Sequence, residues 1–96
     1  MQPVNKDEMI GRIYRTKTGH RQRLAFVNSQ LGEIAVLLKK AGTQIDCVLA
    51  NERSELNSVL SQLNIDQTLQ LLAEREQLLR NIHSANEELK RLGVPL

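Results

Sequence analysis

A heptad repeat of apolar residues between Leu24 and Val48 constrains the fold of this 96-residue chain more than any other feature. Its members recur at alternating steps of three and four residues over about three and a half heptads, which is the spacing of a coiled coil. Such a stripe needs another helix to cover it, so we predict that it is a protein interface. The residues of this heptad stripe are Leu24, Val27, Leu31, Ile34, Leu38, Ala41, Ile45 and Val48.

The composition supports an all-α fold. Only Tyr14 and Phe26 are aromatic, whereas sixteen residues are Leu, so the core must be built from aliphatic side chains. Pro3 and Pro95 are the only prolines, which leaves the long segment between them free to form extended helices. A chain of this length forms one domain with a thin core.

The pattern predicts an antiparallel helical hairpin, a coiled coil that assembles into a helical bundle. We expect one long helix from about Arg21 to Leu63, a turn at Asn64 and Ile65, and a return helix from Asp66 to Leu92. Beyond Val48 the apolar stripe shifts by one position, which we interpret as a stutter in a continuous helix.

The main alternative is a three-helix bundle with a turn at Gly42. Two lysines precede Gly42, as at a helix C-terminus, and Thr43 with Asp46 resembles a weak capping box for a new helix. The heptad phase nevertheless passes through Gly42 unbroken, so we favour a continuous helix.

The return helix has the clearest boundaries. Asn64 and Gln67 resemble a capping box at its start. At its end Gly93 can adopt the left-handed conformation, Val94 can contact Leu89 as in a Schellman motif, and Pro95 prevents continuation.

The predicted helix lengths differ, and this favours assembly. At 1.5 Å per residue the long helix spans about 65 Å and the return helix about 40 Å. The part of the long helix without an intramolecular partner, including Leu24 to Leu38, would therefore associate with another chain. We expect a homodimer that forms a four-helix bundle, or a heteromeric complex.

Positive charge is concentrated at the N-terminus. Residues 1–23 carry six Lys or Arg against Asp7 and Glu8, whereas the remainder carries seven against nine acidic residues. We predict a mobile basic arm over residues 1–19 and a single helical domain over residues 20–96. The residues that such an arm could offer to a nucleic acid are Lys6, Arg12, Arg15, Lys17, Arg21 and Arg23.

No motif indicates catalysis, a metal or a cofactor. His83 has Glu87 four residues later, but two ligands do not make a zinc site, and a plain surface histidine is the favoured interpretation. Cys47 is the only cysteine, which excludes an intramolecular disulfide and fits a reducing compartment. With no apolar run long enough to span a bilayer, we predict a cytoplasmic protein that is neither an enzyme nor a membrane protein.

The sequence therefore favours a non-enzymatic helical module for protein interaction or oligomerisation, such as an adaptor, an assembly subunit or a small chaperone. The alternative is a nucleic-acid-binding protein that uses the basic N-terminal arm on a dimeric helical body.

Overall fold

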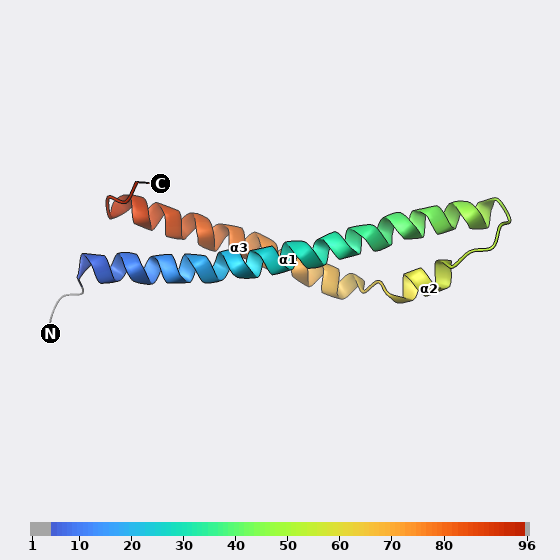
Figure 1. Cartoon of the computed structure of the whole chain (residues 1–96), viewed down its shortest axis with the longest axis horizontal. Helices are drawn as coiled ribbons and strands as arrows, with labels where there is room; N and C mark the ends of the chain where they lie inside the picture. The colour runs from blue at the N-terminus through green and yellow to red at the C-terminus, as the bar shows by residue number, and fades with distance from the viewer. Residues whose placement is uncertain (1–4, 96) are drawn as a thin grey trace.

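The chain forms a long helical hairpin. The computed structural model describes residues 5–95, and within them three helices follow one another: α1 at Lys6–Leu49, α2 at Leu56–Ser61 and α3 at Ile65–Arg91. Figure 1 shows α3 running back along the N-terminal half of α1, while α2 lies beside the C-terminal half. The molecule measures 74 × 25 × 15 Å along its principal axes. The prediction of an all-α helical hairpin is confirmed.

The first helix begins much earlier than predicted. The side chain of Asn5 caps α1 by accepting a hydrogen bond of 2.9 Å from the backbone N–H of Asp7, and Asp7 and Glu8 complement the helix dipole. The predicted start at about Arg21 was therefore wrong, and residues 6–19 of the predicted arm are helical. Residues 1–4 of that arm lie outside the described residues.

The helix passes through Gly42 without a break, so the alternative with a turn at Gly42 was wrong. Its predicted end at Leu63 was also wrong, because α1 ends at Leu49. Asn51 adopts a left-handed φ of 58°, and the N–H of Glu52 bonds to the carbonyl of Cys47 at 2.8 Å. These contacts form a Schellman motif with Asn in place of Gly, so the shifted apolar stripe marks a helix end and not a stutter.

The boundaries of α3 were predicted to within one residue. The side chain of Asn64 accepts a hydrogen bond of 2.9 Å from the N–H of Gln67. At the other end Gly93 has a φ of 83°, and the N–H of Val94 bonds to the carbonyl of Leu89 at 3.0 Å. The Schellman motif predicted from Gly93 is therefore present.

The core is a narrow row between the helices. Its centre is formed by Val27 of α1 with Leu71 and Leu78 of α3. Ala85 and Leu89 continue the buried row toward the chain termini, and Ala41 and Val59 are the buried residues where α2 meets α1. A core one side chain wide leaves the two faces of the hairpin open to solvent.

Candidate interaction surface

The heptad stripe divides into a covered and an uncovered part. Val27 and Ala41 are buried, and the half-buried members Leu24, Leu31 and Ile34 pack against the core. The remaining members, Leu38, Ile45 and Val48, are exposed. The division arises because α3 begins beside Ile34 and Leu38, and the short α2 covers only one side of α1 beyond that point.

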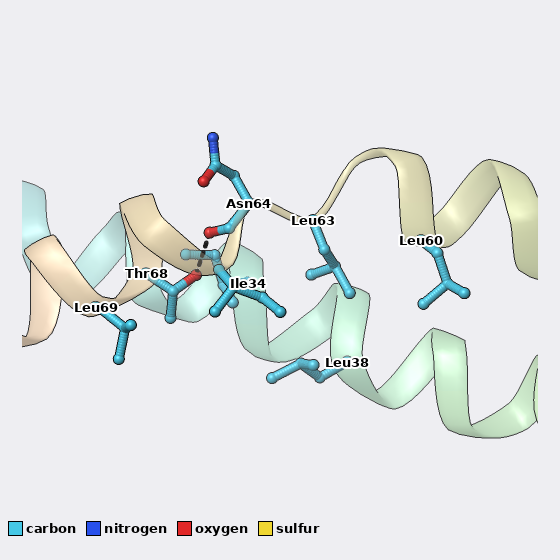
Figure 2. A pocket seen from close by; sticks show the side chains of 8 residues that line it. Ile34, Leu38, Leu60, Leu63, Asn64, Thr68 and Leu69 are labelled. Atoms are coloured by element: carbon cyan, nitrogen blue, oxygen red, sulfur yellow. Dashed lines mark hydrogen bonds between the residues drawn. The ribbon is translucent and has the colours of Figure 1, made fainter.

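An apolar groove lies where α3 begins. It encloses about 390 Å³ and is lined by Ile34, Leu38, Leu60, Leu63, Asn64, Ile65, Thr68 and Leu69. Figure 2 shows Leu38 of α1 on one side of the groove and Leu60 and Leu63 on the other. The Thr68 hydroxyl donates to the Asn64 carbonyl at 2.8 Å, and the Asn64 side chain caps α3. Since these polar groups are already hydrogen-bonded, the groove offers an apolar wall to a ligand.

A second apolar surface extends from the groove along the hairpin. Residues seven apart lie on the same side of a helix, so two rows of side chains face one flank of the molecule. We call this surface the leucine face, and its members are Leu24, Leu31, Leu38 and Ile45 of α1 and Leu72 and Leu79 of α3. Leu38 belongs to both the leucine face and the groove.

One hydrogen bond shows that the two rows lie on the same flank. Asn28 lies between Leu24 and Leu31, and Arg75 lies between Leu72 and Leu79. The Arg75 Nε donates to the Asn28 Oδ1 at 2.9 Å, which joins the two rows across the hairpin. Four members of the face, Leu38, Ile45, Leu72 and Leu79, are exposed. The exposed Leu38 thus joins the leucine face to the groove, and the Asn28–Arg75 contact crosses the face between its two rows.

An ion pair joins the two long helices on the opposite flank. Arg23 lies about 140° around α1 from Asn28 and donates to both carboxylate oxygens of Glu74, with 3.0 Å between Nη2 and Oε2. The Arg23 guanidinium also lies 4.8 Å from the centre of the Phe26 ring, which it partly covers. The hydrogen bonds from Arg23 lower the pKa of Glu74 below its usual 4.5.

We expect this ion pair to contribute to the stability of the hairpin in a pH-dependent way. Because the pKa of Glu74 is lower in the folded than in the unfolded chain, the contribution is present above about pH 4.5 and is lost as pH falls through the folded pKa. We expect Glu74→Gln to lower the melting temperature slightly at pH 6, and we expect this difference from the wild type to diminish as the pH is lowered from 6 to 3. Thermal melts of both proteins across this range measure the effect, with the exposed Glu76→Gln as the control. A difference that did not diminish as the pH falls would contradict the prediction.

The basic residues of the predicted arm do not form one stripe. Arg12 and Arg21 are nine residues apart and so lie on opposite sides of α1, about 180° around the helix. Arg23 is engaged by Glu74, and the Lys17 ammonium lies 6.0 Å from the centre of the Tyr14 ring. Tyr14, the aromatic side chain that base stacking would use, therefore has a lysine ammonium at the outer limit of cation–π distance.

Among residues 5–95, no three His, Cys, Asp or Glu side chains are close enough to hold a metal ion. His83 is exposed, and Cys47 is half-buried with a free thiol. Within the same part of the chain, no helix combines the length and the hydropathy needed to cross a membrane.

The chain matches no protein-family model, no curated protein and no solved structure.

Proposed function

We propose that this chain is a non-enzymatic helical module for protein interaction, which associates with another helical surface through the leucine face and the apolar groove. The observation that carries the proposal is that exposed apolar side chains of both long helices gather on one flank and meet the groove at Leu38. Soluble monomers rarely expose large contiguous apolar patches, and such patches usually mark sites of association. The groove is open and apolar, as is typical of sites that receive the apolar side of a helix.

The predicted alternative, nucleic-acid binding through the basic N-terminal segment, has weaker support. A nucleic acid would meet cations distributed around α1, whereas duplex binding uses cations gathered on one face. Arg23 is already paired with Glu74, and the Lys17 ammonium lies 6.0 Å from the centre of the Tyr14 ring.

A pair of matched substitutions tests the proposal. Leu38 and Val36 are both exposed apolar residues of α1, at 57% and 63%, but only Leu38 belongs to the leucine face. We expect Leu38→Asp to weaken association at least about 30-fold, equivalent to about 2 kcal/mol, because the carboxylate would be desolvated at the interface. Val36→Asp should leave association unchanged.

The measurement is the recovery of stoichiometric protein complexes, whether of this chain with itself or with another protein. Wild-type chain and both variants are isolated from the same cells under identical conditions, and circular dichroism confirms that each is folded. A complex that survives Leu38→Asp, or is lost equally in Val36→Asp, would show that the interface lies elsewhere. A folded chain that forms no complex with any protein would refute the proposal.

A further inference from the structure

We propose that the partner of the leucine face is a second copy of this chain, packed in the antiparallel orientation so that two hairpins form a four-helix bundle. The inference rests on the proposed function and adds the identity of the partner and its orientation relative to the hairpin. Three features of the molecule carry it: its excess surface, its single-layer construction and its charge distribution.

The chain exposes more surface than a compact monomer of its mass. It has an accessible surface of 7374 Å², whereas a folded monomer of 10.9 kDa exposes about 5,600 Å². The radius of gyration is 21.2 Å, against about 12.5 Å for a compact domain of this length. The excess of about 1,800 Å² per chain corresponds to about 3,600 Å² in a dimer, which lies within the range of obligate homodimer interfaces.

The hairpin is a single layer of helices. Within residues 5–95, α1 packs against α3 over one half of its length and against α2 over the other, and no helix lies across this layer (Figure 1). A layer with one apolar face is completed by a second layer, and the face of an identical chain supplies the same aliphatic side chains at the same spacing. Face-to-face packing of two such layers gives a four-helix bundle.

The charge distribution favours the antiparallel orientation. The Asn28–Arg75 contact divides the hairpin into two halves of opposite charge. The half with the chain termini, residues 5–28 and 75–95, carries ten Lys and Arg against five Asp and Glu, a net charge of +5. The half with α2, residues 29–74, carries three against six, a net charge of −3. In the antiparallel dimer the two-fold axis lies between the two layers and is perpendicular to the long axis of the hairpin. This axis places each positive half over the negative half of its partner, whereas a parallel dimer stacks like charges.

Sedimentation equilibrium over a range of concentrations tests self-association. We expect the wild-type chain to have twice the mass of 10.9 kDa at micromolar concentration. Leu38→Asp should shift the protein to monomer, while Val36→Asp should remain dimeric. A wild-type monomer at tens of micromolar would overturn the inference.

The single cysteine provides a test of orientation by pulsed electron paramagnetic resonance. A spin label on Cys47 lies 13 to 19 residues along α1 from the middle of the hairpin, between Asn28 and Ile34. In an antiparallel dimer the two labels are therefore about 40 to 55 Å apart, whereas in a parallel dimer they lie within about 30 Å. A second label, at Ser29 in the Cys47→Ser/Ser29→Cys variant, lies near the two-fold axis and should give a distance below about 30 Å.

Each outcome decides a different claim. A long Cys47 distance with a short Ser29 distance supports the antiparallel dimer, and short distances at both sites overturn it. If the wild-type chain is a monomer that binds a different protein in a manner lost in Leu38→Asp, the second copy is refuted and the proposed function stands. If the folded chain binds neither itself nor another protein, both are refuted.

Discussion

Replacing Val27 by Asp is expected to unfold the hairpin. Val27 is fully buried and packs against Leu71 and Leu78 at the centre of the core, and Arg23, one turn before it, is already paired with Glu74. An unpaired charge at such a site costs about 3 to 5 kcal/mol, a large part of the roughly 5 to 14 kcal/mol that stabilises a domain of this size. The melting temperature should fall by at least about 12 °C, measured by circular dichroism at fixed protein concentration.

Val36→Asp provides the matched control, because it makes the same change nine residues later on the same helix, at an exposed position. Substitutions at exposed positions change stability by about 0.5 kcal/mol or less, which corresponds to no more than about 4 °C. Similar losses in the two variants would mean that Val27 does not lie between α1 and α3.

The boundaries of α3 could be predicted from the sequence because local contacts determine them. Asn64 bonds to a backbone group three residues away, and Gly93 needs only its own left-handed conformation. Neither feature depends on the packing of distant segments, so the residue types at these positions were sufficient.

The start and the end of α1 could not be predicted in the same way. Ile13 is half-buried in the segment beside the end of α3, so tertiary contacts favour a helix where the glycines and threonines of the sequence suggested none. At the other end, the Gln44 side chain accepts a hydrogen bond of 2.7 Å from the N–H of Glu55, and the Gln44 carbonyl accepts one of 3.3 Å from the Ser54 hydroxyl. These contacts hold the chain reversal from eleven and ten residues away, and no pattern of apolar residues reveals them.

The candidate surface was partly visible in the sequence. Leu24, Leu31, Leu38 and Ile45, which recur every seven residues in the heptad stripe, identified the α1 row of the leucine face, since residues seven apart share a side of any helix. The groove could not be derived, because its position depends on where α1 ends and where α3 starts beside Ile34 and Leu38. The end of α1 and the start of α3 also determine which members of the heptad stripe are exposed.

Two glycines in α1 offer a gain in stability. Gly19 and Gly32 are helical and exposed, and a Cβ atom built at either one meets no other atom within 4 Å. Both lie outside the leucine face, so the substitution Gly→Ala at these positions should not disturb the proposed interface.

The double variant Gly19→Ala/Gly32→Ala is expected to raise the melting temperature by about 5 to 15 °C. Each alanine reduces the conformational entropy of the unfolded chain and favours the helix by about 0.5 to 1 kcal/mol, and no steric clash opposes this gain. Thermal melts by circular dichroism at fixed concentration measure the change.

Because Gly42 is also helical with open space around it, Gly42→Ala should stabilise the chain as well, whereas a turn with positive φ at that position would make alanine destabilising. A loss of stability in either variant would contradict a continuous α1 and would favour a helix that breaks at its glycines.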